Sequence, residues 1–249
     1  MNIGALIIGD ELLSGKRQDQ HFNYLQNTLA KRGLELSWTI IVGDEAEQLE
    51  RFLNFSLASQ DLVFSFGGIG ATPDDRTRQS VAKVSEVELY THPDALAEIE
   101  AQFGKLAYPN RILMAELPKG SQIIPNPINR VPGFSMGNHH FMPGFPQMSW
   151  PMVEWILETH YPNLKNLSPQ HEQVIYIKNG RESDLIKAME QMLKDYPSVL
   201  LSSLPHLGEV TYIELSIRGD KNDVERAMLF MKKAIEQRQL TWSDQFDNK

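Results

Sequence analysis

The sequence predicts an α/β protein, a three-layer sandwich with a largely parallel central sheet, followed by a small α+β domain. Over the first 160 residues, short apolar runs alternate with segments of helical spacing, which is typical of a parallel sheet covered on both faces. The later residues follow the order strand, helix, strand, strand, helix, which indicates one sheet with two helices on one face. We place the domains at residues 1–162 and 170–240, with the boundary in YPNLKNLSPQ, residues 161–170.

Five elements open the first domain. Three short apolar runs predict buried strands, and the segments between them carry apolar residues at helical spacing. In chain order these are a strand at 3–9, a helix at 20–31, a strand at 36–43, a helix at 46–59 and a strand at 61–66.

The rest of the first domain is less regular. A helix is predicted over about residues 74–83, a short strand at 87–92 and a helix at 93–103. Residues 118–151 are rich in proline and glycine, with Ile, Phe and Met interleaved, which predicts short strands and tight turns laid beside the sheet. A helix at 152–161 closes the domain.

The second domain is shorter. Its predicted elements are a strand at 173–178, a helix at 182–195, strands at 198–203 and 209–219, and a helix at 223–237. The tail from Thr241 is polar, and we expect it to be frayed.

Composition excludes several classes of function. The net charge of −8 argues against a nucleic-acid partner, and the absence of cysteine excludes disulfides, iron–sulfur clusters and thiolate nucleophiles. Asp10 and Glu11 stand where a signal peptide would stay apolar, and no apolar run approaches the ~20 residues that span a bilayer. We therefore expect a cytoplasmic protein without a membrane partner.

Ligands of parallel α/β sheets lie beyond the carboxyl ends of the strands. Two of the three predicted strand ends carry carboxylates immediately after the strand, and such hard oxygen ligands favour Mg²⁺ or Mn²⁺. The three ends are Gly9-Asp10-Glu11, Val42-Gly43-Asp44 and Gly67-Gly68-Ile69-Gly70. This edge of the sheet is therefore predicted to hold a charged ligand.

The stretch FSFGGIGATPDDRT, residues 64–77, admits two interpretations. One is a helix start, with Thr72 as the N-cap, Pro73 at the first helical position and Asp75 completing a capping box. The other is an anion site, because clustered glycines let the backbone turn sharply and offer N–H groups to a ligand. The neighbouring aspartates would repel a phosphate, a conflict that a divalent cation between carboxylate and phosphate removes.

Other candidate residues favour structural roles. His139 and His140 are adjacent on a predicted strand, so they point to opposite faces and do not easily ligate one ion. Ser14 has no histidine at a triad spacing, so nucleophilic catalysis is not supported. The Met and Phe residues of 134–152 are predicted to belong to the core.

Six short motifs follow one another along the first domain. They are GDELLSG at 9–15, VGDE at 42–45, GGIGATPDDRT at 67–77, IPNP at 124–127, VPGF at 131–134 and MPGFP at 142–146. In these motifs residues 1–160 resemble the N-terminal part of the competence/damage-inducible CinA family, within the molybdopterin-binding MoaB/Mog-like superfamily. The later order of elements and GEVT at 208–211 resemble the small KH-like domain that follows in that family. The family's C-terminal deamidase domain is not matched, so we do not expect nicotinamide mononucleotide deamidation.

The resemblance implies metal-dependent hydrolysis of a nucleotide pyrophosphate of the ADP-ribose or FAD type, or binding of molybdopterin without hydrolysis. It also implies a divalent cation (Mg²⁺, Mn²⁺ or Co²⁺), a nucleotide or pterin phosphate as partner, and a homo-oligomer. Carried over residue by residue, it assigns a metal to Asp10, Glu11, Asp74 and Asp75, with Asp10 and Asp75 also catalytic. It assigns the ligand to Gly67, Gly68, Gly70, Thr72, Ser14, Asn126 and Gly144.

The sequence departs from the family pattern at three positions. Ala71 stands where the family usually has proline, His21 where it often has asparagine, and Met148 where it commonly has glutamate. Methionine neither binds a hard metal nor acts as a base, so hydrolysis and binding without hydrolysis both stay open. A third hypothesis, RNA interaction through the KH-like domain, is opposed by the acidic charge balance and the lack of a GXXG loop.

Overall fold

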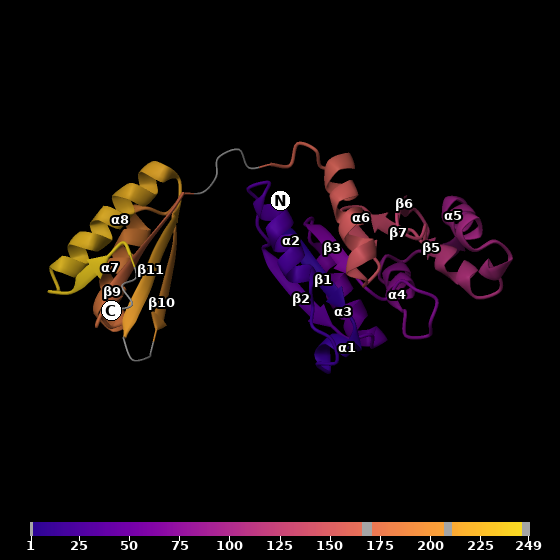
Figure 1. Ribbon diagram of the computed structural model, residues 1–249, viewed down its shortest axis with the longest axis horizontal. Helices are drawn as coiled ribbons and strands as arrows, with labels where there is room; N and C mark the ends of the chain where they lie inside the picture. Colours follow the sequence, from indigo (N-terminus) through magenta and orange to yellow (C-terminus); the bar gives the residue numbers. More distant parts are fainter. Residues whose placement is uncertain (1, 166–170, 207–210, 246–249) are drawn as a thin grey trace. The chain divides into compact units, whose positions relative to one another are not determined.

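The computed structural model describes residues 2–165, 171–206 and 211–245 and divides into two compact units, Met1–Asn166 and Leu167–Lys249 (Figure 1). Residues 166–170 of the predicted boundary and 208–210 of the GEVT stretch lie outside the described residues. Each unit has its own apolar core. Among the helices of the described residues, none is long and apolar enough to cross a membrane.

A six-stranded sheet forms the middle of the first unit, in the order β2-β1-β3-β8-β7-β6. The strands are β1 (Ile3–Ile8), β2 (Trp38–Val42), β3 (Leu62–Phe66), β6 (Gln122–Ile124), β7 (Gly133–Met136) and β8 (His139–Met142). The pairs β1–β2, β1–β3 and β3–β8 are parallel, whereas β7 pairs antiparallel with both β6 and β8. The predicted mixed α/β architecture with a largely parallel sheet is confirmed.

Helices cover both faces of this sheet because its central strands are apolar on both faces. Ile3 and Ile7 of β1 belong to one buried cluster, and Leu6 and Ile8 belong to another. The first cluster is completed by α2 (His21–Ala30) and α6 (Pro146–Thr159). The second is completed by α3 (Ala46–Ala58), α4 (Thr77–Val84) and α5 (Pro93–Phe103). Successive side chains of β1 point to opposite faces of the sheet, and each face is covered by helices. The result is a three-layer arrangement of helices, sheet and helices.

The chain between α4 and β6 forms a small inserted segment, Leu89–Pro118. Its strands β4 (Leu89–Thr91) and β5 (Glu116–Pro118) pair antiparallel as a separate two-stranded sheet. Between them lie α5 and two 3₁₀ turns, η1 (Gly104–Ala107) and η2 (Arg111–Ala115). This segment supplies part of the wall of the cavity described below.

Three boundaries in the first unit differ from the sequence prediction. Within residues 118–151, strands β6, β7 and β8 are part of the central sheet and do not lie beside it. Helix α6 begins at Pro146, because proline suits the first helical turn. Helix α4 begins at Thr77 with Arg76 as its N-cap, so the predicted start at residue 74 and the capping role of Thr72 are wrong.

The second unit is an antiparallel sheet with two helices on one face. Its sheet order is β10-β11-β9-β12, from β9 (His171–Lys178), β10 (Leu200–His206), β11 (Tyr212–Gly219) and β12 (Thr241–Ser243). The helices α7 (Glu182–Asp195) and α8 (Lys221–Glu236) pack on the face that carries Ile175, Ile177 and Leu215. The expected frayed tail is wrong for β12, which pairs with β9 through Trp242 opposite Ile177.

Candidate functional site

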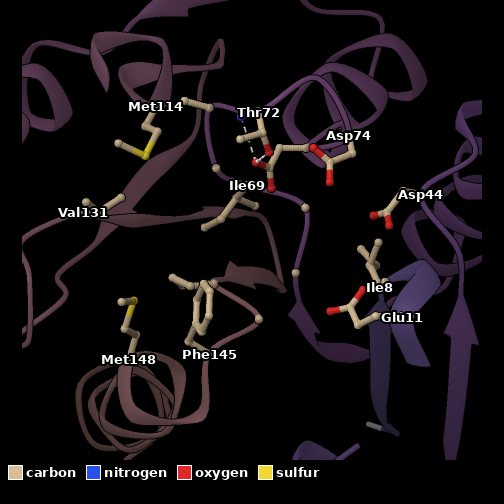
Figure 2. A pocket seen from close by; sticks show the side chains of 18 of the residues that line it. Ile8, Glu11, Asp44, Ile69, Thr72, Asp74, Met114, Val131, Phe145 and Met148 are labelled. Atoms are coloured by element: carbon tan, nitrogen blue, oxygen red, sulfur yellow. Dashed lines mark hydrogen bonds between the residues drawn. The ribbon is translucent and has the colours of Figure 1, made fainter. Parts of the chain in front are cut away.

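A cavity of about 480 Å³ lies at the carboxyl ends of β1, β3 and β8, the edge predicted from the sequence. The loop from Gly67 to Thr72 forms one wall. Figure 2 shows acidic side chains on one side of the cavity and apolar side chains on the other. The acidic residues are Glu11, Asp44, Asp74 and Asp75, and the main apolar ones are Phe103, Met114, Val131, Phe145 and Met148.

The carbonyl groups of the glycine loop are held by the start of α4. Thr77 donates from Oγ1 to the Gly67 carbonyl at 3.0 Å and from its amide to the Gly68 carbonyl at 2.9 Å. Arg78 Nη2 donates to the Gly70 carbonyl at 2.5 Å. Because C=O and N–H point in opposite directions across a trans peptide, the amides that follow these carbonyls point away from α4.

Four consecutive amides of this loop remain available to a ligand. Within the described part of the chain, the N–H groups of residues 68–71 donate to no acceptor, although these residues line the cavity. The backbone turns this sharply because Gly67 and Gly68 adopt φ values of +108° and +68°. A Cβ at Gly70 would collide with the Asp75 carboxylate. Adjacent free amides in such a turn form a concave site for an anion.

Asp75 stabilises the outer part of the loop. Its Oδ2 accepts the Thr72 amide at 3.0 Å and the Thr72 hydroxyl at 2.6 Å, drawn as dashed lines in Figure 2. Asp75 therefore closes a turn ahead of α4, in place of the predicted capping box on the helix. Thr72 and Asp75 both line the cavity.

The acidic side of the cavity is formed by carboxylate side chains from separate loops. Burial raises the pKa of Asp44, and the nearby carboxylates of Asp10, Glu11 and Asp74 raise it further. The Thr72 hydroxyl, the Asp74 amide and Arg76 lower the pKa of Asp74, which is therefore ionised at neutral pH. Together these groups create a negative potential that favours a cation.

The carboxylates do not form a ready chelate. Across the residues that the structure describes, no three His, Asp or Glu side chains converge as a metal-binding group. Asp10 and Asp44 bind each other's amides through their side chains, at 3.1 and 2.9 Å. A cation on this side would therefore need oxygens of a ligand or of water beside those of the protein.

Three residues predicted from the sequence do not line the cavity. Asp10 turns its carboxylate to the β2–α3 loop, and Ser14 ends the short helix α1 (Asp10–Leu13). Asn126 is buried, and its side chain donates to Asn129 Oδ1 at 2.8 Å and to the Val131 carbonyl at 3.0 Å. Asn129 and Val131 do line the cavity, so Asn126 supports the cavity wall through these two residues. Gly67, Gly68, Gly70 and Gly144, which the sequence assigns to the ligand, do line the cavity.

Sequence reasoning missed two charged residues of the wall. Asp44 was identified as following a strand end but received no role, although it lines the cavity. Arg17 lines this cavity and a second one of about 550 Å³ that adjoins it through Glu11, Gly144 and Phe145. No sequence pattern identifies Arg17 as a site residue, because it follows the end of β1 by several residues and belongs to an exposed loop.

His21 supports the wall between the two cavities. Its ring stacks on Phe66 with centroids 4.3 Å apart, and Nε2 lies 3.1 Å from the Gly144 carbonyl. Burial lowers the pKa of His21, so the neutral ring donates its Nε2 proton to that carbonyl. Gly144 in turn packs against Gly67, where a Cβ would meet the Gly67 Cα at 3.3 Å.

His139 and His140 lie away from the cavity, on β8, and both are buried. His140 Nδ1 is 2.8 Å from Ser135 Oγ, and its Nε2 is 3.0 Å from the Tyr161 hydroxyl. Both ring nitrogens of His140 thus have protein partners, which is the arrangement of a structural histidine.

Comparisons with known proteins agree with this fold. Residues 4–165 match the family model described as "Probable molybdopterin binding domain". The chain is 29% identical over 235 residues to the "Putative competence-damage inducible protein" of Clostridium botulinum (strain Loch Maree), covering 92% of this chain and 56% of that protein. It is 32% identical over 185 residues to the "CinA-like protein" of Geobacter sp. (strain M21), covering 72% of this chain and 44% of that protein.

A solved structure is also similar to this chain. The crystal structure titled protein CinA "with unknown function" from Thermoplasma acidophilum is 28% identical, with a TM-score of 0.58. The match covers 64% of this chain and 98% of that one. The chain spans about half the length of the two curated relatives.

Proposed function

Because the chain belongs to the molybdopterin-binding domain family, we propose that its cavity binds a phosphorylated heterocyclic small molecule such as molybdopterin or a nucleotide. The observation that carries this proposal is the run of free amides at residues 68–71, of which those of Gly68, Ile69 and Ala71 are held outward by Thr77 and Arg78. Such amides donate to phosphate oxygens, and they require no side chain to do so.

Arg17 also supports the proposal that the cavity binds the phosphate group of a ligand. It is the one cationic side chain among the described residues that line the first cavity, where every other charged residue is acidic. A guanidinium matches the geometry of phosphate and pairs with two of its oxygens. Arg17 thus offers a counter-charge for an anion that Asp74 and Asp75 would otherwise repel.

The opposite wall suits a flat ring. Phe103, Met114, Phe145 and Met148 surround apolar space, and methionine sulfur packs favourably against aromatic rings. A volume of about 480 Å³ falls in the range of sites for small molecules and cofactors. The ring of a pterin, flavin or adenine fits this wall, with its phosphate at the glycine loop.

Calorimetric titration with inorganic pyrophosphate, ADP-ribose, FAD and molybdopterin tests the proposal. We expect saturable binding, and weaker binding by Gly70→Ala, in which the new methyl group displaces Asp75 from the loop. Gly180→Ala in the second unit is the control, because Gly180 lies outside the cavity and has no left-handed backbone. Failure of the unmutated chain to bind any of these probes would refute the proposed function.

The acidic side favours a second candidate, divalent-metal-dependent hydrolysis of a nucleotide pyrophosphate. Burial and the neighbouring carboxylates both raise the pKa of Asp44, and a bound cation relieves the repulsion between these carboxylates. Glu11, Asp44 and Asp74 provide hard oxygen ligands for it. A cation held there with the phosphate would neutralise charge on the group that is attacked. Met148 opposes hydrolysis, because it places a thioether on the wall at the position where CinA-like sequences commonly carry glutamate.

Product analysis separates the two candidates. Each dinucleotide is incubated with Mg²⁺, Mn²⁺ or Co²⁺, or with chelator, and the products are identified by mass spectrometry. If the protein is a hydrolase, we expect cleavage of the dinucleotide that requires the metal ion and is lost in Asp74→Asn. Tight binding without any cleavage product would leave binding alone as the function of the site.

A further inference from the structure

Arg78 is a buried cation directly behind the glycine loop. It is the second residue of α4, and only 2% of its surface is exposed. Its guanidinium binds three backbone carbonyls from three segments: Gly70 of the loop, Leu113 of η2 and Glu116 of β5. Its Nε atom has no hydrogen-bond partner among the described residues. No carboxylate side chain in the described part of the chain is hydrogen-bonded to the guanidinium.

Such an arrangement is costly as a simple cross-link. Burying a cation removes its hydration, and three carbonyl dipoles replace only part of that stabilisation. Arginine keeps its proton under these conditions, so the positive charge stays beneath the loop. The negative charges of Asp75 and Glu116 favour the charged form of Arg78. Asp75 is also the residue that closes the loop over Thr72.

The bonds of Arg78 determine the direction of two peptide groups. Holding the Gly70 carbonyl turns the Ala71 amide to the opposite side, away from α4. Holding the Leu113 carbonyl likewise orients the peptide that leads into Met114. Ala71 belongs to the anion wall and Met114 to the apolar wall, where Figure 2 shows its side chain above the cavity.

We propose that Arg78 is a positioning residue that sets the phosphate-binding amides and the apolar wall together, so that an anion on the loop is coupled to the placement of Met114. This inference rests on the proposed function, that the cavity binds a phosphorylated ligand. The guanidinium orients both walls of the cavity through the Gly70–Ala71 and Leu113–Met114 peptides. Its positive charge, behind the glycine loop, also attracts the anion. The inserted segment, Leu89–Pro118, is thereby tied to the loop through one side chain.

Affinity and stability measured side by side test this role. Calorimetry with inorganic pyrophosphate and thermal unfolding are carried out on the unmutated chain, Arg78→Lys, Arg78→Met and Arg32→Met. Arg32 is the matched control, because its Nη1 binds the carbonyls of Leu157 and Tyr161, away from the cavity. We expect Arg78→Met to bind pyrophosphate at least about tenfold more weakly, Arg78→Lys to be intermediate, and Arg32→Met to bind normally.

If both Arg78 variants unfold at lower temperature but bind pyrophosphate like the unmutated chain, Arg78 is only a structural cross-link and the inference is wrong. Should the variants not fold, amide NMR of the unmutated chain decides. The Ala71 and Met114 amide signals are then expected to shift along one pyrophosphate titration curve, and a stationary Met114 signal contradicts the coupling. Absence of pyrophosphate binding by the unmutated chain instead refutes the proposed function itself.

Discussion

At the scale of single residues, the candidate site depends on which atoms are already engaged by the protein. Oδ2 of Asp75 accepts both the amide and the hydroxyl of Thr72, and the carboxylates of Asp10 and Asp44 bind each other's amides. The amides of residues 68–71, by contrast, have no acceptor in the described chain. On the glycine-loop side of the cavity, the groups available to a ligand are therefore donors, which recognise an anion.

Replacing Arg17 with glutamine is expected to weaken pyrophosphate binding by about tenfold, because the variant loses a charge-assisted pair in a cavity whose other charges are negative. Lys16→Gln is the control, since Lys16 is an exposed neighbour with the same charge that lines neither of the two adjoining cavities. Calorimetry at constant ionic strength measures both. Equal losses in the two variants would show that only the overall charge matters.

Replacing Met148 with glutamate is expected to favour a cation over a flat ring. The carboxylate would stand beside Asn129, whose Nδ2 lies 3.5 Å from the Met148 sulfur, and would add a hard donor to the wall. We expect tighter Mn²⁺ binding by electron paramagnetic resonance and weaker binding of FAD. Gln147→Glu adds the same charge to the neighbouring cavity and is the comparison. Unchanged Mn²⁺ affinity in Met148→Glu would argue against a cation in this cavity.

At the scale of elements, the regular helices and strands followed from the sequence, whereas the start of α4 and the role of β6 to β8 did not. Thr72-Pro73-Asp74-Asp75 has the composition of a helix start, yet Thr77 and Arg78 anchor the loop carbonyls and the helix begins only there. Strands β6 to β8 are each three or four residues long. Such short segments enter a sheet through tertiary pairing, which local patterns do not encode.

Strand β8 gives the first unit a predictable response to acid. Burial lowers the pKa of His139 to about 4 and that of His140 to about 3, against 6.5 in an unfolded chain. Both rings are neutral when folded, so their contribution to stability is complete above pH 6.5. It is lost as the pH falls towards 4, at about 1.4 kcal/mol per pH unit for each histidine.

Urea unfolding of the first unit between pH 7 and pH 5 measures this response. The free energy of unfolding is expected to fall as the pH falls. In His140→Gln this fall per pH unit is expected to be smaller, because one histidine fewer takes up a proton on unfolding. His206→Gln, at an exposed position in the second unit, is the control. A slope that is the same in His140→Gln and in the unmutated chain would mean that His140 titrates normally in the fold.

At the scale of the whole molecule, each unit holds its own core, and every residue of the two adjoining cavities belongs to the first unit. The motifs of the first unit were enough to predict its family and the edge of the sheet that carries the cavity. They did not reveal that Asp10 faces away from that cavity or that Arg78 lies beneath the loop. Those placements depend on contacts between segments far apart in the chain.

A chain that ends at residue 166 is expected to bind pyrophosphate with the affinity of the full chain, because the cavity needs no residue beyond Met148. Calorimetry on both proteins, with circular dichroism to establish that the shorter one folds, measures this. A folded shorter chain with lost affinity would show that the second unit contributes to the site.

The central claim is that the amides of residues 68–71 bind the phosphate of a small molecule. Its most direct test is a titration of the ¹⁵N-labelled protein with inorganic pyrophosphate, followed through the backbone amide signals. The account predicts that the Gly68, Ile69 and Ala71 signals shift together and saturate, while those of the second unit stay in place. Saturable binding that leaves these three amides unshifted, or no binding at all, would contradict it.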